Sequence, residues 1–469
     1  MTQTIRKNLN DHAWARWSAM VLIALMMLFA HMFVDVISPL KELIQLQRGW
    51  TSDVFGTYAG SEYLLNVWGF LIVAGIILDK MGIRFTGELS AIIMLVGACI
   101  KYYAVSDAFA GTALDMWLNS WWTTMPGSAK LASLGFMIFG CGCEMAGITA
   151  SKALAKWFEG KEMALAMGLE MALARVGVFF IFTISPRIAG IGGIDASVVR
   201  PVAFCTALLC IGLLCYTIFC LMDKKLDKQL GAEATSEAEE EFKIGDIGKI
   251  FGSRLFWIVA MLCVLYYSAI FPFQKFAANM LQSNLGISAT AAADIFRWFP
   301  IGAACITPFL GWYLDRKGKG ATMLILGALL MIICHTTFAL VLPVLPSKAI
   351  AFAAIIVLGV SFSLVPAALW PSIPKIMDKR YLGSAYSLIF WVQNFGLSGT
   401  PILIGYALEK TNPGVAEQIA AGVEGVAYNY TVPMLLFASL GVLALLFALW
   451  LKADDARNHY GLEQPNIKK

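Results

Sequence analysis

Long apolar runs follow one another along this chain and predict its secondary structure. Each run has about 18 or more residues, the length with which an α-helix crosses a hydrocarbon core of about 30 Å. Short polar loops separate them, and the longest polar stretch follows the sixth run. The predicted helices are 17–39, 52–78, 84–105, 131–156, 162–187, 199–222, 254–280, 289–314, 320–343, 348–372, 382–408 and 429–452. The pattern predicts an all-α membrane protein with twelve transmembrane helices in two six-helix bundles.

The polar stretch between the sixth and seventh runs divides the chain. It includes the acidic run Glu239–Glu241 and is too polar to bury. We therefore expect an N-terminal bundle over 1–222, a cytoplasmic linker over 223–253 and a C-terminal bundle over 254–469.

Composition supports the membrane assignment and excludes several function classes. The chain is 59% hydrophobic and 14% charged, with a mean hydropathy of +0.72, which does not fit a soluble domain. Its net charge of +4 comes from scattered basic residues, which gives no signal for nucleic acid. The ten cysteines and four histidines show no metal-ligand spacing, and no phosphate-binding glycine loop is present. We expect no metal, no cofactor, no enzyme activity and no ATP-driven transport.

The positions of lysine and arginine predict the orientation in the membrane. They concentrate at both ends of the chain and in alternate loops, such as 80–84 and 316–319. Cytoplasmic loops carry this excess, so both termini should be cytoplasmic. The first apolar run is too long for a cleaved signal peptide, and we expect it to be retained.

Two charges stand inside the apolar runs on either side of the polar turn 157–162. Glu144 precedes this turn and Arg175 follows it, each about 20 Å away along a helix and so near mid-depth. Ionisable groups at that depth face a cavity or each other. We interpret Glu144 and Arg175 as the floor of a substrate site, and a structural ion pair between the two helices is the alternative.

One short motif occurs twice, each time after the second helix of a half. The spacing G-x-x-x-D-[KR]-x-G begins at Gly75 and again at Gly311. The first glycine permits close helix contact, the aspartate can hold a partner helix, and the second glycine suits a tight cytoplasmic turn. The predicted gating residues of the two copies are Asp79, Arg84, Asp315 and Arg316.

The repeated motif resembles the loop motif of the major facilitator superfamily. That resemblance covers essentially all twelve helices and implies two pseudo-symmetric bundles around a central cavity that opens to alternate sides. Further runs resemble the lysosomal dipeptide transporter subfamily of major facilitator domain-containing proteins, in which the helix 4 glutamate and the helix 5 arginine bind substrate. Those roles fall on Glu144 and Arg175. The runs include 157–162, Ala174-Arg175-Val-Gly177, Tyr266-Tyr267, Leu369-Trp370-Pro371 and Gln393-Asn394.

Other polar and aromatic residues complete the predicted substrate site. Glu144 would bind the ammonium of a zwitterionic peptide, and Arg175 would grip its carboxylate with two parallel hydrogen bonds. Asp35 could share the ammonium or act as a gate, with a water-facing helix end as the alternative. The remaining candidates have amphipathic rings or mid-helix amides that need partners: Tyr58, Tyr267, Trp370, Gln393 and Asn394.

These observations predict a secondary transporter of dipeptides or similar small zwitterions, as a uniporter or coupled to protons. A mono- or dicarboxylate carrier is the alternative, although Glu144 argues against it, and a non-transporting sensor is a third possibility. The expected partners are a small peptide substrate and the lipid bilayer, with a functional monomer and no assigned accessory subunit. Neither terminus carries an acidic dileucine signal, which favours a bacterial inner membrane or plasma membrane over a lysosomal one.

Overall fold

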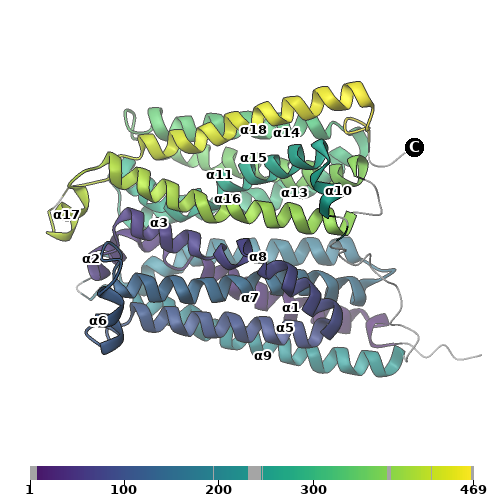
Figure 1. Cartoon of the computed structure of the whole chain (residues 1–469), viewed down its shortest axis with the longest axis horizontal. Helices are drawn as coiled ribbons and strands as arrows, with labels where there is room; N and C mark the ends of the chain where they lie inside the picture. Colours follow the sequence, from purple (N-terminus) through teal and green to yellow (C-terminus); the bar gives the residue numbers. More distant parts are fainter. Residues whose placement is uncertain are drawn as a thin grey trace, which may run out of the picture.

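The computed structural model describes residues 8–193, 195–230, 245, 247–377, 382–423 and 425–465, and all regular structure within these ranges is helical. Long helices lie side by side along the long axis of the molecule (Figure 1). The long helices and their segments are α1 Ala13–Val34, α3 Ser52–Ser61, α4 Leu64–Val67, α5 Phe70–Val105, α7 Gly127–Phe158, α8 Met163–Ala189, α9 Val199–Leu230, α11 Arg254–Leu285, α12 Ala289–Phe296, α13 Trp298–Lys317, α14 Gly320–Thr336, α15 Lys348–Ile376, α16 Leu382–Thr411 and α18 Thr431–Asn458. The short helices are η1 Leu9–Asp11, η2 Ser38–Leu40, α2 Lys41–Arg48, α6 Ala113–Asn119, α10 Ile247–Phe251, η5 Thr337–Val341 and α17 Val415–Ala420.

In the described ranges, ten helical spans are long and apolar enough to cross a membrane. The difference from the twelve predicted helices arises at the second helix of each bundle. The predicted helix 52–78 is interrupted and consists of α3, α4 and the first part of α5, while the rest of α5 is the predicted helix 84–105. The predicted helix 289–314 is interrupted at Arg297 between α12 and α13. Both interrupted helices end in a copy of the repeated motif.

The motif glycines make the turns that their spacing predicts. Gly82 has φ 74° and ψ 174° inside α5, and Gly318 has φ 73° and ψ −137° after α13. A side chain strongly disfavours such backbone angles, so glycine at these positions permits the chain to reverse between helices.

The two bundles are visible as the lower and upper groups of helices in Figure 1. In the first, α1 packs on α8 and α9, and α5 packs on α7 and α9. In the second, α11 packs on α16 and α18, and α14 packs on α15 and α18. Helix α9 extends to Leu230, inside the predicted linker, and the linker residues 231–244 and 246 lie outside the described ranges.

The short helices α2, α6 and α17 lie together at one end of the molecule, which we call the α6 end (Figure 1). The opposite end, the terminal end, holds the beginning and the end of the described chain. There the backbone N–H of Leu9 donates to Gln229 Oε1 at 2.7 Å, near the last residue of α9.

The end of the chain is bound to the second copy of the motif. The backbone N–H of Lys319 donates to the carbonyl oxygen of Glu463 at 3.1 Å. The Glu463 carboxylate accepts from both the backbone N–H and the hydroxyl of Thr322, each at 2.8 Å. Leu462 is buried beside this turn. We call residues 461–464 the tail strap, because they cap the free N–H groups at the start of α14.

Polar contacts between the bundles concentrate toward the α6 end. Gln45 Nε2 donates to the Tyr428 hydroxyl at 2.9 Å, and the backbone N–H of Ser52 donates to Glu409 Oε2 at 3.0 Å. Further hydrogen bonds between the bundles run from Trp391 Nε1 to the carbonyl oxygen of Val67 at 2.8 Å and from Arg175 Nη1 to Thr307 Oγ1 at 3.4 Å. The bundles are therefore closed against each other at the α6 end.

Candidate functional site

Glu144 lies half-buried on α7, beside the interruption of the second helix. One turn earlier on α7, Gly140 lets that interruption come close, because a Cβ there would lie 1.8 Å from the carbonyl oxygen of Glu62. Glu62, at the break of the second helix, therefore lies on a segment that packs against α7 one turn from Glu144.

Arg175 lies half-buried on α8 and reaches the second bundle. Its Nη1 atom donates to Thr307 Oγ1 of α13 at 3.4 Å, and its guanidinium carbon lies 5.1 Å from the centre of the Phe362 ring on α15. Within the described residues no ion pair joins Arg175 to Glu144, nor either of them to another side chain. The arrangement therefore does not support the alternative of a structural ion pair between α7 and α8.

Two of the predicted aromatic residues are linked to Arg175 through the Phe362 ring. Phe362 contacts the Tyr267 ring edge-on with 6.1 Å between centroids, and Trp370 Nε1 donates to the Tyr267 hydroxyl at 3.1 Å. Tyr267 and Trp370 are both half-buried. Arg175, Phe362, Tyr267 and Trp370 thus form one chain of contacts, and the role of Arg175 and this aromatic cluster in binding substrate stays a prediction.

The amide pair of α16 is more enclosed than the aromatic cluster. Gln393 Oε1 accepts from Cys263 Sγ at 3.0 Å, and Asn394 Nδ2 donates to the carbonyl oxygen of Phe390 at 2.8 Å. Asn394 Oδ1 is buried without a partner among the described residues. No described contact joins either amide to Glu144 or Arg175, so their role in the site stays a prediction.

Tyr58 and Asp35 lie in a second group, nearer the α6 end. The Tyr58 ring stacks on Phe136 with 4.9 Å between centroids, and its buried hydroxyl has no partner among the described residues. Asp35 is 1% exposed and accepts from Lys275 Nζ at 3.2 Å. The water-facing alternative for Asp35 is therefore wrong for this state, because an ion pair encloses its carboxylate.

Sequence reasoning missed several buried charges. Glu62, Lys101 and Lys275 are at most 4% exposed, and Glu170 on α8 is 9% exposed with no ion pair or hydrogen bond in the described ranges. A signal for them existed, since each interrupts an apolar run just as Glu144 and Arg175 do.

The predicted gating residues lie at the terminal end. Asp79 accepts from Lys152 of α7 at 2.8 Å, and Arg84 pairs with Asp223 of α9 at 3.0 Å and also with Asp227. Asp315 and Arg316 end α13, and the Arg316 guanidinium lies 4.9 Å from the centre of the Trp312 ring. The described partners of Asp79 and Arg84 belong to the same bundle, so a latch between bundles stays a prediction.

Comparisons with known proteins extend over most of the chain. The family model of the Major Facilitator Superfamily matches residues 23–401 and 273–466. The lysosomal dipeptide transporter MFSD1 of Danio rerio is 27% identical over 380 residues, covering 79% of this chain and 75% of the relative. The human protein of that name is 25% identical over 347 residues, covering 72% and 68%.

Solved structures agree with the family match. The xylose transporter XylE from E. coli, in a partially occluded inward-open conformation, superposes with a TM-score of 0.68 at 14% identity, covering 93% of this chain and 99% of that one. A bacterial homologue of the human lysosomal transporter Spinster, inward-facing and unoccupied, gives 0.69 at 14% identity, covering 94% and 98%. Likeness at this identity shows the fold.

Proposed function

This chain belongs to the Major Facilitator Superfamily, and on that premise we propose that it carries dipeptides or similar small zwitterionic peptides across a membrane by alternating access. Members of this family are transporters and not enzymes. The peptide substrate rests on the site and on relatives that are named as dipeptide transporters.

One observation carries the choice of substrate. Glu144 and Arg175 are both half-buried at mid-depth, and neither is neutralised by an oppositely charged side chain in the described part of the chain. Uncompensated charges inside a membrane protein are costly and mark substrate paths. A zwitterion supplies both missing partners at once, with its ammonium at Glu144 and its carboxylate at the fork of Arg175.

The aromatic cluster beside Arg175 would hold the side chains of the peptide. Tyr267 and Trp370, which are half-buried, and the buried Phe362 offer flat apolar faces that do not require one side-chain shape. This arrangement favours a broad choice of side chains over a narrow one.

We place the α6 end outside the cell and the terminal end in the cytoplasm, because the lysine-rich and arginine-rich loops lie at the terminal end. The contacts at the α6 end then make this structure a state closed to the outside. We also propose that the bundles are 1–222 and 254–469, joined by the linker 223–253. The family fold and the packing of the helices support this division.

The test is thermal stabilisation of the purified protein by unlabelled dialanine. Glu144→Gln and Arg175→Gln should each raise the dialanine concentration needed for a given stabilisation by about fivefold to a hundredfold. Each variant leaves one buried end of the peptide without its charge partner, a loss of about 1–3 kcal/mol. Both variants should stay monodisperse.

Two matched variants control for the loss of charge. Glu88→Gln removes a half-buried carboxylate from α5, and Arg187→Gln removes a guanidinium from α8 that Asp294 neutralises at 2.7 Å. Neither should change the response to dialanine. If Glu144→Gln and Arg175→Gln respond as these controls do, the peptide site lies elsewhere. A carboxylate carrier would instead be stabilised equally by dialanine and its N-acetylated form.

A further inference from the structure

Four charged side chains are buried together between the bundles, on the α6 side of the candidate site. Asp35 at the end of α1, Glu62 at the break after α3 and Lys101 of α5 belong to the first bundle, and Lys275 of α11 belongs to the second. They are 1%, 4%, 0% and 4% exposed, in that order. We call these four residues the buried charge cluster.

Lys275 joins the two acids of the cluster. Its Nζ atom lies 3.2 Å from Asp35 Oδ1 and 3.2 Å from Glu62 Oε2, and it also donates to the carbonyl oxygen of Val34 at 3.1 Å. The neighbouring Gln274 donates to the other Asp35 oxygen. One cation of the second bundle therefore serves two carboxylates of the first.

Lys101 stays with the first bundle and has a different environment. Its Nζ atom lies 4.2 Å from the centre of the Phe33 ring and 4.3 Å from that of Phe136, and it donates to the Phe33 carbonyl oxygen at 3.4 Å. Its described contacts include no ion pair, although it interacts through space with Glu62 and Asp35. Cation–π interactions with the Phe33 and Phe136 rings stabilise its ammonium group.

The buried charge cluster has a net charge of zero only while the α6 end is closed, because its two carboxylates are then balanced by two ammonium groups, one of them from the second bundle. When the bundles separate at this end, α11 takes Lys275 with it, and the first bundle keeps two carboxylates and one ammonium. A carboxylate that loses its partner while it stays poorly hydrated is unfavourable, so another cation beside Glu62 would favour opening.

We propose that Glu62 couples peptide binding to opening of the α6 end, with the peptide ammonium replacing Lys275 as its counterion. This inference rests on the proposed function. Glu62 lies at the break of the second helix, where its carboxylate pairs with Lys275 and its backbone packs against Gly140 of α7, one turn from Glu144. An ammonium bound at Glu144 would thus lie near the segment whose carboxylate loses Lys275 on opening.

Peptide binding and opening of the α6 end are then coupled. A ligand shifts a conformational balance only through its different affinity for the two states. The peptide ammonium would compete with Lys275 for Glu62 in the closed state and would have no competitor in the open one. Peptide therefore favours opening toward the outside, and an empty site favours the closed state.

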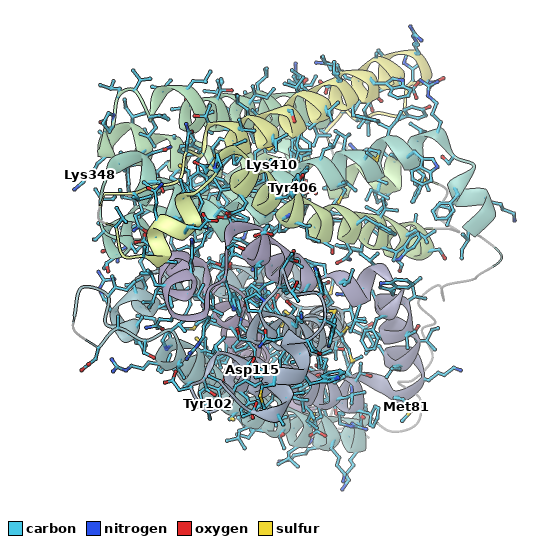
Figure 2. The ribbon with its side chains drawn as sticks, turned by 60° about the vertical axis from the view of Figure 1, so that its left-hand side comes forward. Met81, Tyr102, Asp115, Lys348, Tyr406 and Lys410 are labelled. Atoms are coloured by element: carbon cyan, nitrogen blue, oxygen red, sulfur yellow. The ribbon has the colours of Figure 1, made fainter. Side chains whose placement is uncertain are left out.

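The experiment measures the distance between spin labels on the two bundles. Labels at Tyr102→Cys on α5 and Lys348→Cys on α15 occupy exposed positions near the α6 end, one in each bundle (Figure 2). The background replaces the exposed Cys99, Cys210 and Cys305 by alanine. Pulsed electron double resonance is recorded in lipid nanodiscs without peptide and with saturating dialanine.

In the otherwise unchanged chain, dialanine should increase the population with the longer distance. Lys275→Gln should raise that population about tenfold or more without peptide, because the ion pair that favours closure is absent. Glu62→Gln should weaken thermal stabilisation by dialanine less than Glu144→Gln does, and it should lose the dialanine-dependent change in distance. The charge-balanced double variant Glu62→Gln, Lys275→Gln should give the longer distance regardless of peptide, and it serves if Lys275→Gln alone does not fold.

Glu42→Gln is the matched control, because Glu42 also accepts a hydrogen bond across the bundles, from Gln282, but lies away from Glu144. It should keep the response to dialanine. The inference is overturned if the distance in Glu62→Gln still changes with dialanine, or if Glu62→Gln loses thermal stabilisation as fully as Glu144→Gln does. A chain that dialanine does not stabilise refutes the proposed function, whereas one that is stabilised without a change in distance refutes this inference alone.

Discussion

Adding one methyl group at Gly405 should open the α6 end. Gly405 of α16 faces α3 of the other bundle, where a Cβ atom would lie 2.3 Å from the carbonyl oxygen of Ser52 and 2.9 Å from the Cα atom of Gly56. Both neighbours are backbone atoms, so no side-chain rotation can relieve the overlap. Ordinary contact begins at 3.4 Å, so the helices must separate by 3.4 − 2.3 = 1.1 Å at this point.

The cost falls on the closed state alone, because α3 and α16 part when the bundles open. Overpacking of this kind costs about 1–3 kcal/mol, which corresponds to a fall of about fivefold to a hundredfold in the ratio of closed to open molecules. Gly405→Ala should therefore lengthen the distance between labels at positions 102 and 348, even without peptide.

Gly399 offers a control on the same helix. A Cβ at Gly399 would meet no atom within 4 Å, so Gly399→Ala should leave the label distance unchanged. The reasoning is refuted if Gly405→Ala and Gly399→Ala give the same distance distribution. Gly56→Ala together with Gly405→Ala should cost less than the sum of the two, because the first separation makes room for the second methyl group.

Three further outcomes test the terminal end. Asp79→Asn removes a half-exposed pair with Lys152, worth about 0–1 kcal/mol, so it should raise the labelling of a cysteine probe at this end by a few fold, and unchanged labelling would exclude a latch. Glu463→Gln weakens the cap of α14 and should speed hydrogen exchange in the first turn of that helix, measured against the first turn of α15. A hydrogen bond from Arg16 lowers the pKa of Glu162 below its ordinary value of 4.5. The stabilisation from this contact is therefore fully present above pH 4.5 and is lost as the pH falls through the lowered pKa. Proteolysis of the N-terminal segment should be faster at about pH 3 than at about pH 6.

The sequence was sufficient for the order of the helices, because each apolar run is long enough to span a membrane and little else forms from such a run. It also predicted the turns at Gly82 and Gly318, since the motif spacing places glycine where φ must be positive. It did not predict the interruptions at Glu62 and Arg297. A single polar residue in an apolar run does not reveal whether the helix continues through it.

For the site, sequence reasoning singled out Glu144, Arg175 and Asp35 but missed the partner that Asp35 shares with Glu62, which is Lys275 of the other bundle. Glu144 and Arg175 stand on neighbouring helices, so their depth follows from counting residues. The pairing of Lys275 with Glu62 joins positions 213 residues apart, in different bundles. Local spacing carries no information about such a contact, which depends on how closely the bundles approach.

The tail strap also constrains the order in which the second bundle is completed during synthesis. The turn at 318–322 obtains its caps from Leu462 and Glu463, which the ribosome adds more than a hundred residues later. Until those residues emerge, the first N–H groups of α14 must be satisfied by water or by headgroups at the membrane surface. The loop that joins α13 to α14 should therefore be among the last parts of the nascent protein to become protected from proteases, although its own helices enter the membrane much earlier.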